Sequence, residues 1–538
     1  MTDAETAPPA GRRVRDGLAS RGLTVLAGAV SVAVLLPLLW LFIAGSRVGL
    51  GSAAEILLRP ETLQIVVNSL LLTGIVTAAS VLLGVPLAYL TTRTDLPFRR
   101  FFTVALAMPL VIPSYVGAFA FASAFAPRGT VQSLLEPLGV ESIPGVYGLP
   151  GTALVVTLYT YPYVFITTRA ALQSLDTRLV DAARTLRHGR WEAFRRVTLP
   201  QIRPAVTAGA LLVSLYALSD FGTPAILRYD VFTRAIFVEF RTFGRNTAAL
   251  LSVVLVAITV AVLALERRYS GGDRVQSKRG HAGRDSRLRL GRWRWPAVVP
   301  CLLVAGLALV VPLGILGLWL VRTGDPGLSF GWGVVLNSVG VAAGAALLAA
   351  VAGLPIAHLS ARDDSRLAAA FERASYVGYA VPGIVVGLAL VFLGARYGGG
   401  WYRSGALAFP LLLFAYVVRF LPQAVGSTRA SILRVSPALP EAARSLGRSP
   451  LGAFRSVTLP LTAPGQVGGA ALVFLTTMKE LPATLMLRPG GFETLVTFIW
   501  RAEREAAYGA AALPAVALLL VSALSMLVIL SMEGYHVE

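Results

Sequence analysis

The stretch EAARSLGRSPLGAFRSVTLP, from Glu441 to Pro460, gives the first indication of how this chain is built. A counterpart, DAARTLRHGRWEAFRRVTLP, runs from Asp181 to Pro200, and the two stretches align without a gap at an offset of 260 residues. Agreement over this length at one fixed offset indicates an internal duplication. The chain therefore contains two copies of one structural unit.

Each copy has the pattern of two short helices joined by a turn. Glu441 suits the first turn of a helix, where the helix macrodipole favours negative charge. Gly447 allows the chain to turn after this helix, and Ser449 can cap a second helix that begins at Pro450. The first helix also has a shallow apolar face that a partner can approach closely, formed by Ala442, Ala443 and Leu446.

This pattern resembles the EAA loop of the permease subunits of bacterial ABC importers. The second copy fills every position of that motif, with valine for the usual isoleucine: Glu441, Ala442, Ala443, Gly447, Val457, Leu459 and Pro460. The first copy keeps five of these positions, namely Ala182, Ala183, Val197, Leu199 and Pro200. It has Asp181 for the glutamate and Arg187 for the glycine, so its turn can instead fall at Gly189. The resemblance implies docking into a groove of a cytoplasmic ATPase subunit; the alternative is an ordinary basic helical connector.

Composition places the chain among polytopic membrane proteins. It has 538 residues, of which 55% are hydrophobic and only 14% are charged. The formal charge of +20 would suggest nucleic-acid binding in a soluble protein. Here the basic residues flank apolar runs, so the positive-inside rule accounts for them, and no nucleic-acid partner is expected.

Lysine and cysteine usage exclude several kinds of site. Lys278 and Lys479 are the only lysines, and neither follows a glycine, so the chain has no GxxxxGK[ST] phosphate loop. ATP hydrolysis must then come from another chain. Cys301 is the sole cysteine, which excludes an intrachain disulfide and a cysteine metal cluster. The four histidines are scattered without zinc-site spacing, and no catalytic signature, resident metal or cofactor is predicted.

The sequence predicts an all-α protein with about twelve transmembrane helices, taking about 20 apolar residues as one span. Six spans of the first half are predicted near 23–45, 65–90, 101–126, 149–171, 204–227 and 247–266. Six of the second half are predicted near 297–321, 334–360, 368–395, 406–427, 464–487 and 509–532. The first span is long enough to be an uncleaved signal anchor.

The duplication extends beyond the loops. At an offset of 269 residues, four positions of the second span recur: Asn68, Gly84, Pro86 and Arg93 correspond to Asn337, Gly353, Pro355 and Arg362. Since each copy holds six spans, both enter the membrane in the same direction and form two parallel six-helix repeats. Pro113 and Pro382 interrupt the third spans. The first interpretation is a structural kink, and the second is a role in gating.

The predicted organisation has three parts. They are an N-terminal permease half at 1–266 with its EAA loop near 176–203, a basic linker at 267–296, and a C-terminal permease half at 297–538 with its EAA loop near 436–463. Arginines precede the first span, so the N-terminus is expected inside. Both EAA loops, the linker and both termini are then expected in the cytoplasm.

Two carboxylates lie in apolar stretches at equivalent positions. Asp220 and Glu480 are 260 residues apart, and Arg228 and Arg488 follow at the same offset. An ionisable group at membrane depth normally faces a bundle interior or an aqueous path, so these residues are candidates for the outer part of a transport pathway. Oxygen ligands suit a hard cation, which could make transient contact there. The alternative is structural pairing with Lys479 or a neighbouring arginine.

These stretches, the YPYV and LRP sequences at Tyr161–Val164 and Leu487–Pro489, and the full-length duplication resemble the double-length permeases of ferric iron importers. Thiamine and phosphonate permeases share much of that architecture, so another small solute remains an alternative substrate. The resemblance implies a transport subunit of the bacterial inner membrane that is not itself an enzyme and works by alternating access. The implied partners are membrane lipid, two copies of a cytoplasmic ABC ATPase that binds ATP and Mg, and a periplasmic or lipid-anchored substrate-binding protein.

Two function classes compete with this interpretation. An ion-coupled secondary transporter also uses parallel repeats, but it does not need two cytoplasmic docking loops, and its uptake would stop with the ion gradient. A channel or a structural scaffold is the second competitor, which ion conduction by the isolated chain would favour.

Overall fold

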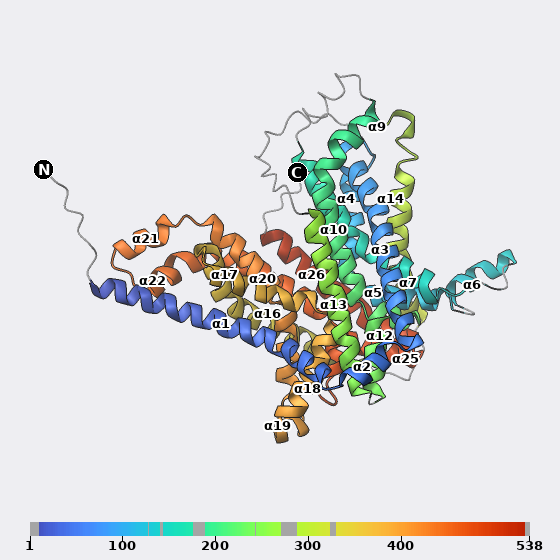
Figure 1. Ribbon diagram of the computed structural model, residues 1–538. Helices are drawn as coiled ribbons and strands as arrows, with labels where there is room; N and C mark the ends of the chain where they lie inside the picture. The colour runs from blue at the N-terminus through green and yellow to red at the C-terminus, as the bar shows by residue number, and fades with distance from the viewer. Residues whose placement is uncertain are drawn as a thin grey trace. The chain divides into compact units, whose positions relative to one another are not determined.

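A computed structural model provides the fold and describes residues 10–126, 129–139, 142, 144–175, 189–242, 244–270, 288–322 and 330–532. Over these ranges the chain is built from helices, and its extended pairing is limited to an isolated bridge between Thr94 and Leu288. The predicted all-α membrane fold is confirmed (Figure 1).

Ten helices in the described part of the chain are long and apolar enough to cross a membrane. They are Arg21–Ser46, Pro60–Arg93, Gly148–Ser174, Phe194–Ser219, Arg245–Leu265, Gly291–Val321, Trp332–Arg362, Ala408–Arg434, Pro450–Met478 and Tyr508–Val528. Two further helix pairs bring the number to twelve if each pair counts as one span. The number of spans therefore agrees with the predicted twelve, and the two third spans are helix pairs with a break instead of continuous helices.

Both third spans break at the prolines that the sequence singled out. In the first, α4 (Arg99–Ala107) and a 3-10 turn end before Pro113, and α5 (Ser114–Ala124) leaves at 93°. In the second, α17 (Arg366–Ala380) ends before Pro382, and α18 (Gly383–Tyr397) leaves at 102°. These bends are much larger than an ordinary proline kink, so each third span is broken into two helices.

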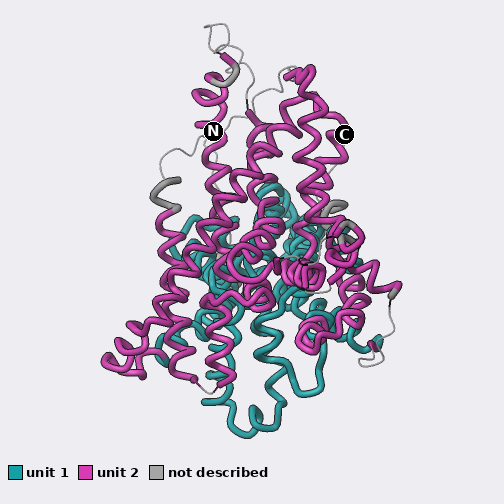
Figure 2. Tube along the Cα trace, turned by 90° about the vertical axis from the view of Figure 1, so that its right-hand side faces the viewer, with its two compact units in different colours: residues 1–44, 331–497, 520–538 teal, residues 45–330, 498–519 magenta. Residues whose placement is uncertain are grey.

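The chain forms two compact units, which are coloured in Figure 2. Unit 1 comprises residues 1–44, 331–497 and 520–538, and unit 2 comprises residues 45–330 and 498–519. The first span of each sequence half thus belongs to the unit built mainly from the other half. Within unit 1, Trp40 packs edge-on against Tyr397, with ring centroids 4.9 Å apart.

Unit 2 holds most of the helices of the first sequence half. Besides α4 and α5 it contains α2 (Leu50–Leu57), α3 (Pro60–Arg93), α6 (Thr130–Leu135), α7 (Gly148–Ser174), α9 (Arg190–Ala193), α10 (Leu199–Ser219), α11 (Gly222–Ile226), α12 (Phe232–Arg241), α13 (Arg245–Ser270), α14 (Val298–Ala305) and α15 (Val311–Arg322). One π-helical turn, Phe194–Thr198, joins α9 to α10, and another, Gly306–Val310, joins α14 to α15.

Unit 1 holds most of the second sequence half. Besides α17 and α18 it contains α1 (Ala10–Ser46) as far as residue 44, α16 (Trp332–Arg362), α19 (Gly399–Arg403), α20 (Ala408–Arg434), α21 (Ala438–Ser445), α22 (Pro450–Ala453), α23 (Leu459–Met478) and α24 (Pro482–Leu487). The π-helical turn Phe454–Thr458 joins α22 to α23. Two last helices, α25 (Leu495–Arg504) and α26 (Tyr508–Met532), are divided between the units.

Equivalent residues of the two halves form equivalent hydrogen bonds. The side-chain amide of Asn68 donates to the carbonyl oxygen of Asp230 at 2.9 Å, and that of Asn337 donates to the carbonyl oxygen of Glu493 at 3.0 Å. These pairs tie the start of each second span to the segment before α12 or α25. The sequence repeat is therefore also a repeat of tertiary structure.

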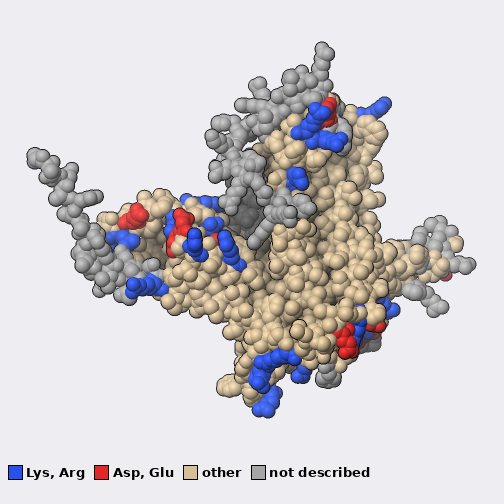
Figure 3. All heavy atoms as spheres, viewed as in Figure 1, with Lys and Arg blue, Asp and Glu red and all other residues tan. Residues whose placement is uncertain are grey.

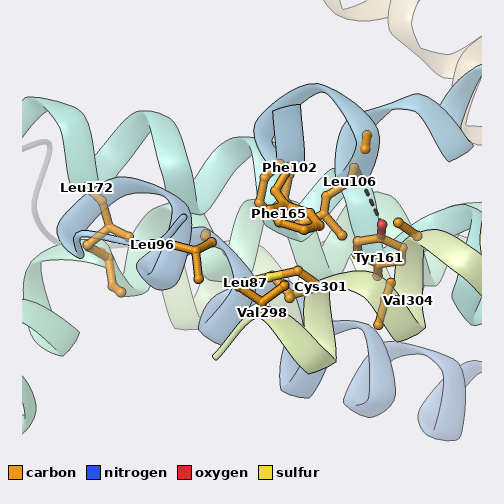
Figure 4. Close-up of a cluster of buried hydrophobic side chains, with 14 of the residues drawn as sticks. Leu87, Leu96, Phe102, Leu106, Tyr161, Phe165, Leu172, Val298, Cys301 and Val304 are labelled. Carbon is orange, nitrogen blue, oxygen red and sulfur yellow. Dashed lines mark hydrogen bonds between the residues drawn. The ribbon is translucent and has the colours of Figure 1, made fainter. Parts of the chain in front are cut away.

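A buried cluster in unit 2 shows how its spans pack (Figure 4). Phe102, Phe165 and Cys301 meet there, and the hydroxyl of Tyr161 donates to the carbonyl oxygen of Leu106 at 2.8 Å. Cys301 comes from α14, so the first span of the second sequence half completes a core of the first half. This cysteine is buried and free, as the sequence required.

Large apolar side chains remain exposed along the spans. Examples are Val25, Leu82, Leu347 and Leu524. On the face of unit 2 visible in Figure 3, the surface over the middle of α10 and α13 is uncharged, and charges gather toward the ends of these helices. An apolar belt between charged ends is typical of a protein that spans a bilayer.

Candidate functional site: two loops and two broken spans

The second EAA loop forms the predicted helix, turn and helix. Glu441 lies in the first turn of α21, which ends at Ser445 and is followed by Gly447 with a φ of +89°. The amide of Arg448 donates to the carbonyl oxygen of Ala443 at 3.1 Å, which is the bond of a Schellman motif and satisfies a terminal carbonyl. The Ser449 hydroxyl then accepts from the amide of Gly452 at 3.1 Å, so it caps α22 as predicted.

The first helix of this loop presents an apolar surface. Glu441 and Ala442 are exposed, Ala443 is half-buried, and Leu446 is 87% exposed. An exposed leucine of this degree on a short helix contributes little to the fold of its own chain. The face formed by Ala442, Ala443 and Leu446 is therefore available to another protein.

The first EAA loop is described only from Gly189 onward, so Asp181, Ala182 and Ala183 lie outside the described residues. Gly189 precedes α9, and its carbonyl oxygen accepts from the amide of Ala193 at 2.9 Å. It aligns with the helix cap Ser449 and does not have a positive φ. Gly189 thus begins the second helix of its loop.

Both loops continue into the fifth span in the same way. Leu199 and Pro200 begin α10, and Leu459 and Pro460 begin α23. Each pair follows a five-residue π-helical turn. Such turns are rare and are frequently found at functional sites, and here the same turn occurs twice at the same offset.

The fifth spans end earlier than the sequence predicted. The predicted spans near 204–227 and 464–487 include a break, because α10 ends at Ser219 and α23 ends at Met478. Asp220 directly follows α10, and Lys479 and Glu480 follow α23. The short helices α11 and α24 begin after these residues.

Glu480 is held by an ion pair. Its carboxylate contacts the guanidinium of Arg419 from α20, and its Oε1 accepts from the amide of Ala483 at 3.1 Å. The exposed fractions of the two charged side chains are 7% for Glu480 and 13% for Arg419. The predicted alternative of pairing with an arginine therefore describes Glu480, although the arginine comes from the fourth span.

Arg419 was missed by the sequence analysis, although the sequence contains a signal for it. It stands in AYVVRFLP, inside the apolar stretch of the fourth span. A buried arginine needs a partner, and Glu480 was one of the two carboxylates that the sequence places at membrane depth. Gly383, the first residue of α18, packs against this pair so closely that a β-carbon there would collide with Glu480 Oε1.

Asp220 is held by hydroxyl groups. Its Oδ2 accepts from the Ser114 hydroxyl at 3.0 Å, and Ser114 Oγ in turn accepts from the Tyr216 hydroxyl at 3.0 Å. Ser114 begins α5 directly after the proline break, so the carboxylate joins the ends of two broken spans. Among the described residues, no arginine or lysine forms an ion pair with the half-buried Asp220. The two equivalent carboxylates therefore have different electrostatic surroundings.

The other two candidate arginines do not meet these carboxylates. Arg228 lies over the ring of Tyr147, with its guanidinium carbon 5.0 Å from the ring centroid. It also lies close to Glu503, where burial raises the pKa of the carboxyl group and Arg504 and Arg228 oppose that shift. Arg488 approaches Glu493 at 4.0 Å. The described residues contain no group of three or more histidine, cysteine, aspartate or glutamate side chains that could hold a metal ion.

Comparisons with known proteins agree with this architecture. Residues 80–270 and 333–535 each match the family described as "Binding-protein-dependent transport system inner membrane component". The Fe(3+)-transport system permease protein FbpB 2 of Haemophilus influenzae is 31% identical over 93% of this chain and 96% of its own length.

Of two other relatives, one also names ferric iron and one names molybdenum. The ferric transport system permease protein FbpB of Actinobacillus pleuropneumoniae is 24% identical over 88% of this chain and 71% of its own length. A probable molybdenum ABC transporter permease protein of Haloferax volcanii is 32% identical over 46% of this chain and 88% of its own length. The two matched segments carry the two EAA loops and the two broken fifth spans, and the chain belongs to the family of binding-protein-dependent transport system inner membrane components, of which it contains two copies.

Proposed function

We propose that this chain is the complete membrane permease of an ATP-driven importer for ferric iron. The observation that carries the substrate assignment is the similarity to an Fe(3+)-transport permease over 93% of this chain and 96% of the relative. A family match in both halves supports the use of one double-length chain in place of two permease subunits. The chain itself performs no covalent chemistry.

The partners follow from the loops. Each EAA loop docks one copy of a cytoplasmic ABC ATPase, which binds ATP and Mg, and a periplasmic or lipid-anchored protein delivers the substrate. Support comes from the exposed Ala442 and Leu446 on α21, which suit a groove that admits small and aliphatic side chains. The loops and both termini then lie in the cytoplasm. ATP-driven closure of the ATPase pair moves the loops and opens the pathway on the opposite side.

A charge reversal tests the docking. Glu441→Arg places positive charge in the first turn of α21, where the macrodipole disfavours it, and should weaken binding of the ATPase. Asp181→Arg should have a smaller effect, because that copy already departs from the motif. Pull-down of the ATPase from detergent extracts measures both. Unchanged binding and transport in the double variant would contradict docking through these loops.

Asp220 is the better candidate for contact with the substrate. Glu480 is neutralised by Arg419, whereas hydroxyl groups surround the Asp220 carboxylate. Carboxylate and hydroxyl oxygens suit a hard trivalent cation. An ion held too tightly does not leave a pathway, so a single carboxylate fits a transient station better than a storage site.

Reconstitution tests the function as a whole. The chain, its ATPase and its binding protein are placed in proteoliposomes, and uptake of radioactive ferric iron is compared with uptake of molybdate, thiamine and a phosphonate. Iron uptake that requires ATP and the binding protein is expected, and the chain without ATPase should hydrolyse no ATP. Uptake of molybdate instead would favour the second candidate, which is supported by the molybdenum relative that matches 46% of this chain. Uptake driven by an ion gradient alone would contradict the whole proposal.

A further inference from the structure

The last turn of each second span holds the start of the EAA loop. In unit 2, the Arg93 guanidinium at the end of α3 donates to the carbonyl oxygens of Leu172 and Leu175, where α7 ends; its distance to the second oxygen is 3.1 Å. In unit 1, the corresponding Arg362 donates to the carbonyl oxygens of Ile432 and Val435. A helix leaves its last carbonyls without partners, and a charged donor satisfies them well.

The unit 1 contacts have the same form as those of unit 2. Their distances are 3.1 Å to Ile432 and 2.7 Å to Val435. In each unit the acceptors lie three residues apart at the end of the fourth span, directly before the EAA loop. The same two carbonyls are therefore capped by the same arginine in two independent copies.

The same turn of the second span also holds the end of the loop. The Tyr89 ring meets the Phe194 ring edge-on, with centroids 5.4 Å apart and an interplanar angle of 84°. In unit 1, the rings of His358 and Phe454 meet at 5.6 Å and 81°. Phe194 and Phe454 are the first residues of the two π-helical turns that lead into the fifth spans.

The second span also packs closely against the fourth span. The contact lies more than one helical turn before Tyr89 and His358 in the sequence. A β-carbon on Gly84 would lie 2.9 Å from Cβ of Val164 in α7, and one on Gly353 would lie 3.1 Å from a methyl group of Val425 in α20. These glycines let the helices approach closely, as small residues do in membrane helix packing. The last turn of each second span therefore adjoins a region where the second and fourth spans pack closely.

We infer that the last turn of the second span, carrying Tyr89 and Arg93 in one half and His358 and Arg362 in the other, is the positioning element that couples each EAA loop to the transmembrane helices. The inference rests on the proposed ATP-driven function. The arginine fixes where the loop begins, and the ring fixes where it ends. A movement imposed on the loop by an ATPase is then transmitted to the second span as well as to the fourth and fifth spans.

The decisive variant is the pair Arg93→Gln with Arg362→Gln in the complete complex of permease, ATPase and binding protein in proteoliposomes. ATPase pull-down and basal hydrolysis should remain close to wild type, because neither arginine belongs to the exposed docking face. The amount of iron transported per ATP hydrolysed should fall about tenfold, since loss of the charge-assisted bonds releases the start of the loop. Arg→Lys at both positions should recover part of this ratio.

Arg434→Gln is the matched control. Arg434 lies in the last turn of α20, two residues after the capped Ile432, and its side chain is exposed. Its loss removes one positive charge beside the carbonyls that Arg362 caps and leaves that cap in place, so it is compared with Arg362→Gln alone. The transport-to-hydrolysis ratio of this variant should equal that of the wild type. An equal fall in the control would mean that positive charge matters and capping does not, which overturns the inference.

A second pair tests the other contact independently. Tyr89→Leu with His358→Leu keeps apolar volume but removes the ring edges that meet Phe194 and Phe454. It should also lower transport per ATP while ATPase binding persists. If the arginine and ring pairs both transport like the wild type, or both fail to assemble with the ATPase, the turn is not a coupling element. A wild-type complex that never takes up iron would instead defeat the proposed function.

Discussion

At the residue scale, equivalent positions in the two halves have diverged in charge. Glu480 lies beside Arg419 with both side chains largely buried, whereas the half-buried Asp220 is bonded to hydroxyl and amide groups. The position 260 residues before Arg419 is Tyr159, so the first half has no arginine there. Within the described residues, one half thus pairs its carboxylate with an arginine, and the other holds it with uncharged donors.

Removal of one member of the buried pair should be costly. Glu480→Gln leaves the Arg419 guanidinium without its counter-charge and should lower the stability of the folded protein by about 3–5 kcal/mol. The melting midpoint of the purified permease in detergent measures this effect. Asp220→Asn is the matched control, since an amide oxygen can still accept from Ser114 and the variant should melt close to wild type. A wild-type midpoint for Glu480→Gln would show that the pair does not stabilise the fold.

Asp220→Asn, which should leave the melting midpoint unchanged, should have a large effect on transport. Asp220→Asn removes the charge proposed to attract ferric iron and should reduce uptake severely while leaving assembly with the ATPase intact. Initial uptake rates in proteoliposomes, normalised to the amount of folded permease, measure this. Normal uptake by Asp220→Asn would assign this carboxylate a structural role only.

At the element scale, the sequence predicted the turns, caps and breaks that depend on residues close together in the chain. Gly447 and Ser449 predicted the turn and the cap of the second loop correctly, because a left-handed glycine and a capping hydroxyl act within a few residues. Pro113 and Pro382 likewise marked the broken third spans. The breaks after Ser219 and Met478 were not predicted, since apolar residues continue beyond them and hydropathy alone cannot distinguish one long span from a helix followed by a short one.

The turn of the second EAA loop gives a test at this scale. Gly447 has a φ of +89° with open space around its α-carbon, so Gly447→Ala costs about 1–2 kcal/mol through backbone strain alone. This cost corresponds to roughly a 5–30-fold change in an equilibrium and should appear as weaker ATPase binding. A titration of labelled ATPase measures the affinity.

Gly189→Ser is the comparison for that variant. Gly189 lies where Ser449 caps the other loop, and no described atom beyond its chain neighbours lies within 4 Å of a β-carbon placed there. Serine is at least as good a cap as glycine, so this change should leave binding unchanged or improve it slightly. Equal weakening by both variants would argue against a left-handed requirement at Gly447.

At the scale of the whole molecule, packing does not follow the order of the sequence. Unit 1 includes α1 from the start of the chain, and unit 2 includes α14 and α15 from the second half. The duplication could predict that the two halves have similar helices, because the second span, the EAA loop and the fifth span of one half correspond to those of the other. It could not predict which copy a first span packs against, since two similar halves offer similar surfaces.

This exchange of first spans predicts how the chain behaves when it is divided. A fragment of residues 1–270 lacks Val298, Cys301 and Val304, which complete the buried cluster around Phe102 (Figure 4). Membrane helices associate chiefly through close packing, so the loss of these contacts should leave the fragment aggregated or degraded. The fragment 288–538 should fail alone in the same way, because it lacks α1. Coexpression should restore a complex that copurifies and melts close to the intact chain, as size-exclusion chromatography and thermal unfolding can show. A monodisperse 1–270 fragment as stable as the full protein would mean that each half folds on its own first span and that the exchange is dispensable.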